Sequence, residues 1–270
     1  MIHVTPDGIL LSVEKIRETS PLIHNITNYV VMNTTANALL ALGASPVMAH
    51  AIEEVRDMVS LARALVINLG TLSPSWVESA FSAVEEATAR GIPVIIDPVG
   101  AGATPYRTKT FRDLIRAFSP TVIRGNASEV MALSTEAAKT KGVDSTNASH
   151  QALDAAFQLT EELGSVICIS GETDYVIHNT TVTKIKNGHP MMQRVTGLGC
   201  TASALCGAFA AVQPDAVRAV AEAMAVMGIA GEIAAAGSPG PGTLQLRFID
   251  VLYQLNETDI TGLLNVEEGL

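Results

Sequence analysis

The sequence predicts an α/β fold in which helices cover both faces of a mostly parallel central sheet, with a helical C-terminal part. Short apolar segments that fit buried strands alternate with segments of helical periodicity between residues 5 and 171. From residue 174 the pattern changes to two short strands that fit an antiparallel hairpin. Residues 201–236 contain 14 alanines, which favour closely packed helices. These observations predict one helix layer on each side of the sheet.

The elements of the first 70 residues follow from cap and turn residues. A helix is expected to begin at Pro6, because proline after Thr5 fits the first helical position. Gly43 is expected to end a second helix, since glycine readily adopts the left-handed conformation that closes helices. This part should contain strands at 21–25, 46–49 and 64–69, and helices at 30–42 and 53–62.

The same alternation continues to residue 171. Ser73 and Pro74 are expected to start a long helix that Gly91 ends. This part should contain strands at 93–96, 121–123 and 165–170, and helices at 74–90, 108–118, 128–133 and 151–163. Residues 175–178 and 182–185 then fit the hairpin, and the chain is expected to be largely helical from 199 to 236.

The composition fits one globular domain. Of the 270 residues, 48% are hydrophobic and 16% are charged, which excludes a disordered chain. No tandem repeat or low-complexity linker divides the sequence. The best loop candidate is 138–147, and the segments on both sides of it fit the same sheet. We therefore expect residues 1–270 to form a single domain.

Charge and cysteine content limit the class of partner and the compartment. The net charge is −10 and no cluster of lysine or arginine occurs, so nucleic-acid binding is not expected. The most apolar stretch, 201–212, is too short to span a membrane. Three cysteines in no zinc-binding pattern fit a reducing compartment. Because the first residues show no secretory signal, we expect a cytoplasmic protein without a membrane partner.

Ligands of open α/β sheets bind at the carboxyl ends of the strands. Eight residues fall at such positions: Asn25, Asn28, Met48, Asp97, Arg124, Asn126, Ser170 and Gly171. Asp97 directly follows an apolar strand and precedes two glycines of the DPVGAGAT segment. Its carboxylate could hold Mg²⁺, which prefers one or two carboxylates with phosphate oxygens and water. The alternative is an aspartate that caps the next helix or turn.

The segment Arg124-Gly125-Asn126-Ala127-Ser128-Glu129 follows a second strand. The planar guanidinium of Arg124 suits phosphate binding. Glu129 lies three residues after Asn126, a spacing that also fits a capping arrangement at a helix N-terminus. Both interpretations are compatible, because a carboxylate at the cleft can cap a helix and also lie near hydrated Mg²⁺.

Glycines open the apolar helix at TGLGCTA, residues 196–202. The N–H groups near Gly197 and Gly199, together with the helix dipole, would attract negative charge and could stabilise a phosphoryl group in transfer. Cys200 lies near this N-terminus, where the pKa of a thiol usually falls, so it could accept or orient a proton. The alternative is a small buried residue needed for packing.

Other motifs are absent or out of place. The glycine segment matches a dinucleotide fingerprint, but helices follow it rather than the required strand–helix–strand unit. The sequence contains no P-loop, no H-E-x-x-H and no G-x-S-x-G. Nicotinamide chemistry, zinc hydrolysis and acyl transfer are therefore poorly supported.

The sequence resembles the hydroxyethylthiazole kinases. The resemblance is carried by LIHNITNYVVMNTTANALLALGASPVMA, DPVGAGAT, IRGNASE, SGETDYV, TGLGC and PGPGTLQLRFID, in this order over nearly the whole chain. It implies a ribokinase-like three-layer αβα fold and transfer of the γ-phosphoryl group of ATP to the alcohol of hydroxyethylthiazole, a step of thiamine salvage. It also implies a homotrimer with the thiazole site between subunits.

The resemblance implies roles for seven residues of this chain: Met48 and Gly197 would contact the substrate, Arg124 and Ser170 would contact ATP, Asp97 and Glu129 would bind or orient Mg²⁺, and Cys200 would be catalytic. From their positions at strand ends and at the start of the apolar helix, we add Asn25 to the substrate residues, Asn126 to the ATP residues, and Gly197 and Gly199 to the catalytic residues. Cys200 stands where most ribokinase-like enzymes have an aspartate base. The chain departs from the family pattern at Leu198, where threonine is common, and at Ser170, Thr201 and Ala202.

Other functions remain open at this point. A hydroxymethylpyrimidine kinase or a nicotinamide-nucleotide-hydrate dehydratase would share the fold, although Cys200 in place of aspartate argues against both. A non-catalytic ligand-binding relative would bind ATP without releasing ADP. A nicotinamide-dependent oxidoreductase would rest on the glycine pattern alone.

Overall fold

The computed structural model describes residues 4–134 and 145–269, which contain a nine-stranded sheet in the order β2-β1-β3-β4-β5-β6-β7-β8-β9. The strands from β2 to β6 are parallel, and β7, β8 and β9 are antiparallel. Their bounds are β1 Leu22–Ile26, β2 Ser45–Val47, β3 Ala64–Asn68, β4 Val94–Asp97, β5 Val122–Asn126, β6 Val166–Ser170, β7 Asp174–His178, β8 Thr181–Ile185 and β9 Val266–Glu268. The predicted mostly parallel sheet with a hairpin is confirmed.

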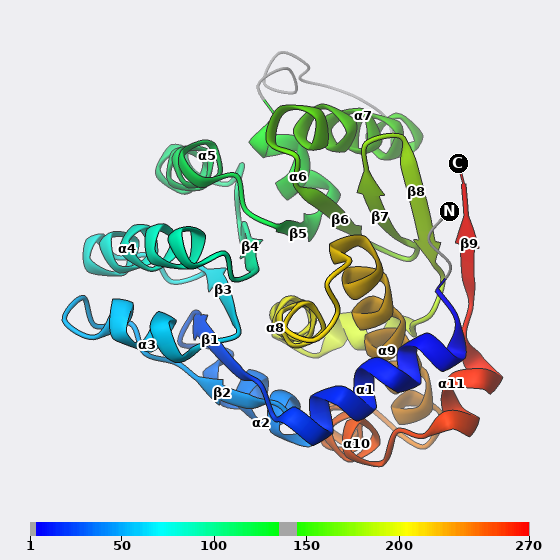
Figure 1. Ribbon diagram of the computed structural model, residues 1–270. Coiled ribbons are helices and arrows are strands. Elements are labelled where there is room, and N and C mark those ends of the chain that lie inside the picture. Colours follow the sequence, from blue (N-terminus) through cyan, green and yellow to red (C-terminus); the bar gives the residue numbers. More distant parts are fainter. Residues whose placement is uncertain (1–3, 135–144, 270) are drawn as a thin grey trace.

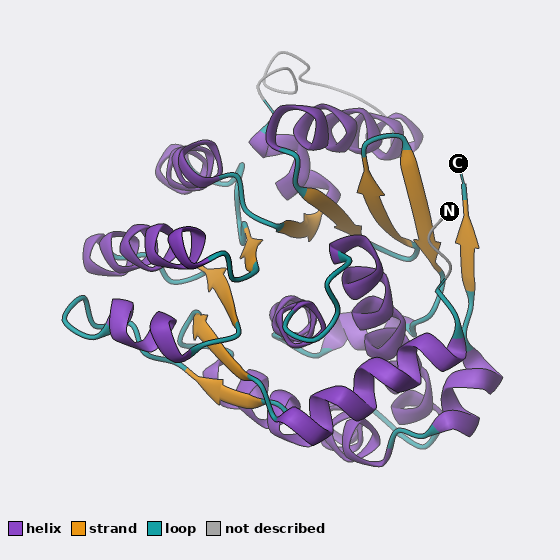
Figure 2. Ribbon diagram, in the orientation of Figure 1, coloured by secondary structure: helices purple, strands orange, loops and turns teal. Residues whose placement is uncertain are grey.

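Helices cover both faces of this sheet (Figures 1 and 2). One layer holds α1 Pro6–Thr19, α2 Met32–Leu42, α8 Leu198–Ala210, α9 Ala216–Ala236, α10 Pro241–Gln254 and α11 Glu257–Leu263. The other holds α3 Val55–Leu61, α4 Pro74–Arg90, α5 Pro105–Phe118, α6 Ala127–Leu133 and α7 Ser145–Leu163. The predicted three-layer αβα arrangement with a helical C-terminal part is therefore confirmed.

Two apolar cores lie on the two faces of the sheet. In β3, Ala64 and Val66 join the core under α8 and α9, whereas Leu65 and Ile67 join the core under α4 and α5. Side chains of a strand alternate between faces, so a strand buried on both sides must be apolar throughout. This requirement explains why the sequence shows short, continuous apolar runs rather than alternating ones.

Cap residues place the helix ends where the sequence predicts them. Thr5 Oγ1 accepts a hydrogen bond from the Gly8 N–H at 3.1 Å, and Ser73 Oγ accepts one from the Trp76 N–H at 3.4 Å. Gly43, with φ of 111°, ends α2 in the left-handed conformation. These local interactions satisfy backbone groups that a helix leaves unpaired at its ends.

Some elements differ from the predictions. Helix α5 begins at Pro105 rather than at residue 108, because Thr104 caps it and proline occupies its first position. Strand β5 continues to Asn126, so Arg124 and Asn126 belong to the sheet. Elements α10, α11 and β9 lie beyond the last predicted helix. The loop expected at 138–147 lies outside the described residues up to 144, and α7 begins at Ser145.

Helix α9 is the one helix in the described ranges whose length and apolar composition would suffice to cross a membrane. In its most apolar 18-residue window, 83% of the residues are buried inside the protein. Burial of this extent is what a core helix requires, and Figure 1 shows α9 packed beside α8 and α10.

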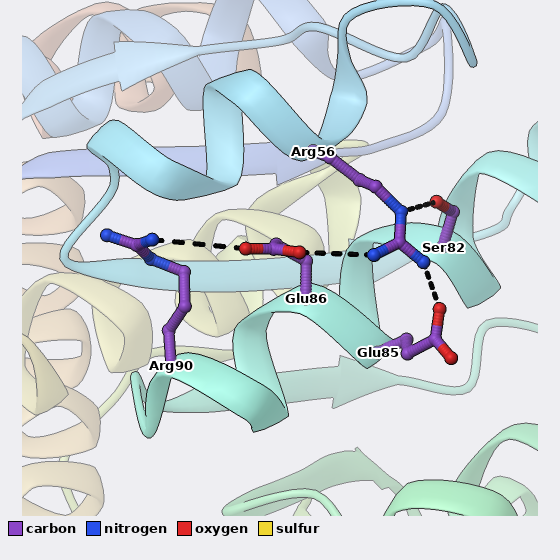
Figure 3. A network of polar contacts seen from close by, with 5 residues as sticks. All are labelled: Arg56, Ser82, Glu85, Glu86 and Arg90. Carbon is purple, nitrogen blue, oxygen red and sulfur yellow. Dashed lines mark hydrogen bonds and ion pairs between the residues drawn. The ribbon is translucent and has the colours of Figure 1, made fainter.

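A surface network of polar contacts joins α3 to α4 (Figure 3). Arg56 on α3 donates to Ser82 Oγ at 3.0 Å and to Glu86 Oε2 at 3.1 Å, and it also pairs with Glu85. Arg90 extends the network through Glu86, at 3.9 Å. Because these charges are partly exposed to water, their attraction is screened.

Replacing Arg56 by alanine should lower the free energy of unfolding by about 1 kcal/mol or less, since exposed ion pairs contribute little. Urea unfolding at low salt and in 1 M NaCl would measure this, and the difference should shrink in high salt. Arg218→Ala is the comparison, because Arg218 pairs at 2.7 Å with Glu222, which is fully buried. The Arg218→Ala variant should lose clearly more free energy of unfolding than Arg56→Ala. Equal losses in the two variants would contradict the argument from solvent screening.

Candidate active site

The polar centre of the molecule lies at the carboxyl ends of the neighbouring strands β1, β3 and β4. Parallel register places Asn68, the last residue of β3, beside Asp97, the last residue of β4. Asp97 Oδ2 accepts hydrogen bonds from Asn68 Nδ2 at 2.9 Å and from Ser203 Oγ of α8 at 2.8 Å. Asn28, which follows β1, donates to Asn68 Oδ1 at 2.9 Å. The sheet therefore brings together three polar side chains that lie far apart in the sequence.

The surroundings of Asp97 make its carboxylate more basic than usual. Burial and, to a smaller extent, the nearby Glu129 carboxylate raise the pKa of Asp97, whereas Arg124 and the hydrogen bonds from Ser203 and Asn68 lower it, and the net result is a pKa of about 6. A carboxylate with a pKa near the working pH is suited to accept a proton. Asp97 is therefore the strongest candidate base of this site.

Arg124 lies between two acidic groups beneath the start of α8. Its Nη1 donates to the Gly199 carbonyl oxygen at 2.9 Å, and its side chain is buried. Asp97 and Asp174 raise the pKa of Arg124 against the opposing effect of burial. Arg124 Nε is buried without a hydrogen-bond partner in the described part of the chain. The guanidinium thus keeps an unused donor close to the glycine segment.

Glu129 forms the capping arrangement that its spacing indicated. Its Oε2 accepts from the Asn126 N–H at 2.9 Å, and Asn126 Oδ1 accepts from the Glu129 N–H at 3.0 Å. Glu129 Oε1 also accepts from the Gly100 N–H at 2.9 Å, which ties the DPVGAGAT loop to α6. The carboxylate is therefore held by two backbone N–H groups, and it lies close enough to Asp97 to raise the pKa of that carboxylate.

Helix α8 begins where the glycine segment was expected to open a helix. Gly197 is the residue before the helix, with φ of 85°, and a Cβ added there would lie 2.7 Å from Val31 Cγ1. Glycine is required for both reasons. The first N–H groups of α8 have no partner within the helix, and the helix dipole makes this end attractive to negative charge.

The expectation that the pKa of Cys200 falls at the helix N-terminus is wrong. Burial raises the pKa of this thiol to about 11, and the charge of Asp97 raises it as well. Asn28 Nδ2 lies 3.7 Å from Cys200 Sγ and donates to it. The cost of burying a thiolate beside a carboxylate exceeds the attraction of the helix dipole, so Cys200 is a neutral thiol near pH 7.

A cavity of about 800 Å³ opens beside this centre. Its lining includes five of the candidate residues named from the sequence, namely Arg124, Asn126, Ser170, Gly171 and Gly199. Its opposite wall comes from the segment after β8 and from α9, with Lys186, Asn187, Gly188, His189, Pro190, Met192, Gln193, Met224, Met227 and Gly228. The volume suffices for a nucleotide-sized ligand.

The remaining candidates lie outside this cavity lining. Met48 is half-buried just after the edge strand β2. Asn25 is buried within β1, where its Nδ2 donates to the Ile23 carbonyl oxygen at 2.9 Å. Its Oδ1 has no hydrogen-bond partner among the described residues. The structure thus places Arg124, Asn126, Ser170 and Gly199 on the cavity wall, whereas Asp97, Glu129, Gly197 and Cys200 are not among its lining residues.

Sequence reasoning missed several residues of this site. Asn68 is the last residue of its strand, as Asp97 is, so its position at the carboxyl end of a strand could have identified it. Ser203 lies inside an apolar helix and gave no signal. Asp174 lines the cavity, accepts from the Gly171 N–H at 3.0 Å, and has its pKa raised by burial to about 6.

The carboxylates of Asp97 and Glu129 suit a divalent cation that takes its remaining ligands from water and substrate phosphates. Within residues 4–134 and 145–269 no group of three or more histidine, cysteine, aspartate or glutamate side chains could hold a metal alone. Asp97 and Glu129 offer carboxylate oxygens close together. Hard cations such as Mg²⁺ are commonly bound by one or two carboxylates, with water and substrate phosphates completing the shell.

Comparisons with known proteins agree on one family. A model of the hydroxyethylthiazole kinase family matches residues 13–258. A hydroxyethylthiazole kinase from Syntrophus aciditrophicus is 61% identical over 269 residues, which cover 99% of this chain and 100% of that protein. One from Leptospira biflexa is 53% identical, covering 94% of this chain and 95% of that protein.

Solved structures agree with the fold. The structure of a hydroxyethylthiazole kinase protein from Pyrococcus horikoshii OT3 matches with a TM-score of 0.90 and 41% identity, covering 98% of this chain and 100% of that one. A pyridoxal kinase from Staphylococcus aureus, solved with AMP-PCP and pyridoxal, matches with a TM-score of 0.64 at 15% identity, covering 92% and 98%. The second similarity supports the ribokinase-like fold alone.

Proposed function

Since this chain belongs to the hydroxyethylthiazole kinase family, we propose that it transfers the γ-phosphoryl group of ATP to the hydroxyl of hydroxyethylthiazole, a salvage step toward thiamine. The observation that supports this most directly is the buried Asp97 carboxylate, which lies beside Arg124 at the N-terminus of α8 and next to a cavity of about 800 Å³. Phosphoryl transfer needs positioning, a base and fixed positive charge, and these groups supply all three.

The ATP phosphates lie, in this proposal, at Arg124, Asn126 and Ser170 on the cavity wall. Arg124 contributes permanent charge and its unused Nε donor. The first N–H groups of α8, near Gly197 and Gly199, receive the negative charge that develops on the transferred group. All these donors are fixed by the fold before the ligand arrives, which is the condition for strong electrostatic stabilisation.

Glu129 would bind the divalent cation, which we propose is Mg²⁺, and Asp97 would lie near it through bound water, so that the free oxygen of Asp97 can still accept the substrate proton. The cation would neutralise charge on the phosphate oxygens. Glu129 is fixed for this role by the N–H groups of Gly100 and Asn126. Asp97 keeps one oxygen bound to Asn68 and Ser203, so its orientation is set by the protein.

The alcohol substrate is placed toward Met48, Gly197 and Asn25. Gly197 keeps the chain close to Val31, and Asn25, buried near the end of β1, has an Oδ1 without a hydrogen-bond partner among the described residues. Asp97 takes the proton of the substrate hydroxyl. Cys200, a neutral thiol with a pKa of about 11, orients the hydroxyl and does not remove its proton.

Replacing Cys200 by serine should leave kcat within about threefold of wild type, and Cys200→Ala should lower it by about tenfold, because only a positioning contact is lost. Steady-state ADP release at saturating substrates measures both. Buried Cys206→Ser is the control for losing a thiol elsewhere in α8. A fall of more than about 100-fold in Cys200→Ser, at unchanged KM, would make Cys200 the base instead of Asp97.

The proposed reaction is tested by ADP release with Mg²⁺ and ATP in three parallel assays: hydroxyethylthiazole, hydroxymethylpyrimidine and no acceptor. We expect release that depends on the thiazole alcohol and exceeds the other two. Release that depends on the pyrimidine alcohol would support the pyrimidine kinase. ATP binding without ADP release in any assay would support a non-catalytic relative.

Three further points belong to this proposal. We place the protein in the cytoplasm as a single domain over residues 1–270, which its three free cysteines and continuous sheet support. We also propose a homotrimer with active sites between subunits. Large apolar side chains that stay exposed in the single chain support an assembly: Tyr29, Val30, Leu40, Leu246 and Tyr253. Light scattering coupled to size exclusion would measure the number of subunits.

A further inference from the structure

One continuous hydrogen-bonded chain joins Cys200 to Asp97 through two side-chain amides. Asn28 Nδ2 donates to Asn68 Oδ1 at 2.9 Å and lies 3.7 Å from Cys200 Sγ. Asn68 Nδ2 donates to Asp97 Oδ2 at 2.9 Å, and Ser203 Oγ donates to the same oxygen at 2.8 Å. All four hydrogen-bonding side chains, Asn28, Asn68, Asp97 and Ser203, are buried.

The Asp97 carboxylate decides which group donates and which accepts in each of these hydrogen bonds. An ionised Asp97 only accepts, so Asn68 must present its nitrogen to Asp97. The Asn68 oxygen then faces Asn28 and also accepts from the Gly70 N–H at 3.2 Å. This leaves the Asn28 nitrogen directed at both Asn68 and Cys200, while Asn28 Oδ1 accepts from the Val30 N–H at 3.1 Å. Neither amide can flip without breaking two contacts.

Ser203 and Asn68 differ in their hydrogen-bond partners. The Ser203 hydroxyl contacts Asp97 and, at 3.5 Å, the Gly199 carbonyl of the preceding turn, but neither amide. Asn68 contacts Asp97 on one side and Asn28 on the other, and Asn28 donates to Cys200 at 3.7 Å. The Asn68 side chain also acts on the Cys200 thiol directly, since hydrogen bonding from both amides lowers the pKa of that thiol. Buried polar networks of this kind lose more than one contact when one member is removed, because the remaining groups lose their orientation.

We propose that Asn68 and Ser203 are positioning residues of the phosphoryl transfer: both hold one oxygen of Asp97 in place, and of the two only Asn68 also sets the position of Cys200, directly and through Asn28. This inference rests on the proposed function for its kinetic consequence. It assigns a role to two residues that do not themselves line the cavity. Its structural part, the link from Asn68 to Cys200, does not depend on which alcohol is phosphorylated.

The kinetic test compares Ser203→Ala and Asn68→Leu, which keeps most of the side-chain volume, in wild-type and Asp97→Asn backgrounds. In wild type, each should lower kcat about 10- to 100-fold, as for groups that orient a catalytic residue, with the KM for ATP changed less than threefold. In the Asp97→Asn background, Ser203→Ala should cost less than twofold, because it acts only through Asp97. Equal losses in both backgrounds would overturn the role of Ser203.

Ser79→Ala and Thr183→Val are the matched controls. Both hydroxyls are buried, as in Ser203, but have no hydrogen-bond partner among the described residues. They should leave kcat within twofold of wild type. Thermal unfolding of every variant separates loss of fold from loss of orientation. If Asn68→Leu does not fold, Asn68→Ala and Asn68→Ser replace it. Folded Asn68 variants with unchanged kcat would overturn the proposal.

Alkylation tests the link to Cys200 without turnover. Cys168 and Cys206 are fully buried, so iodoacetamide should label the half-buried Cys200 first, and peptide mass spectrometry confirms the labelled thiol. Asn68→Leu should change the labelling rate of Cys200 at least threefold, whereas Ser203→Ala should not. An unchanged rate in Asn68→Leu would overturn the link. Wild type that releases no ADP with hydroxyethylthiazole would instead contradict the proposed function and leave this readout intact.

Discussion

Replacing Asp97 by asparagine should lower kcat at least about 100-fold and leave the fold intact. Asparagine has the same shape and can still accept from Ser203, but it cannot take up the proton of the substrate hydroxyl. Removal of a general base typically costs 10²–10⁴-fold in rate. Steady-state ADP release at saturating ATP and thiazole alcohol measures the loss, and thermal unfolding verifies the fold.

Asp174→Asn is the matched comparison for this prediction. Asp174 is also a buried carboxylate near Arg124, and burial raises its pKa to about 6 as it does for Asp97. Its Oδ1, however, accepts from the Gly171 N–H and does not contact Asn68 or Ser203. We expect its kcat to fall at least tenfold less than that of Asp97→Asn. Equal losses would mean that the charge around Arg124, and not the base, limits the reaction.

Local sequence signals predicted most elements of the sheet and its helices. Helix α4 runs from Pro74 to Arg90 as expected, because Ser73 caps it and Gly91 ends it. Such ends depend on neighbouring residues only, so they can be read from the sequence. Strand β9 could not be found in this way. Its three residues form a strand through pairing with β8, which lies about 80 residues earlier in the chain.

The rule that ligands bind at the carboxyl ends of strands predicted part of the candidate site. It selected Asp97, Arg124, Asn126 and Ser170, which the structure places around one centre. It did not reveal that Asn68 contacts Asp97, because that contact depends on the register between β3 and β4. Ser203 was missed for a different reason: serine within an apolar helix resembles a packing residue until the facing carboxylate is known.

The chemistry of Cys200 shows where a local rule fails. A position near a helix N-terminus lowers the pKa of a thiol when the site is open or positively charged. Here burial and the charge of Asp97 act in the opposite direction and have the larger effect. Neither the depth of burial nor the distance to Asp97 can be obtained from the spacing of residues 97 and 200. The protonation state of Cys200 therefore required the folded structure.

The second large effect is expected at Arg124, whose replacement by alanine should raise the KM for ATP at least tenfold and lower kcat about 100-fold. The guanidinium holds the Gly199 carbonyl and lies between Asp97 and Asp174, so its loss removes the positive charge opposite two buried carboxylates. Loss of one fixed donor to a developing negative charge costs about 10²–10³-fold in kcat. Arg124→Lys should recover part of the KM, because it restores the charge without the planar fork.

Arg112→Ala separates this catalytic effect from the loss of a structural arginine. Arg112 also holds backbone carbonyls, those of Ala132 at 2.9 Å and Ser134 at 2.8 Å, but it does not line the cavity. Its replacement should lower the melting temperature and leave the KM for ATP within twofold of wild type. Isothermal titration with a non-hydrolysable ATP analogue would measure binding by both variants without turnover. If Arg124→Ala binds the analogue as tightly as wild type, the phosphates do not lie at Arg124, and the cavity wall formed by residues 186–193 becomes the place to search for them.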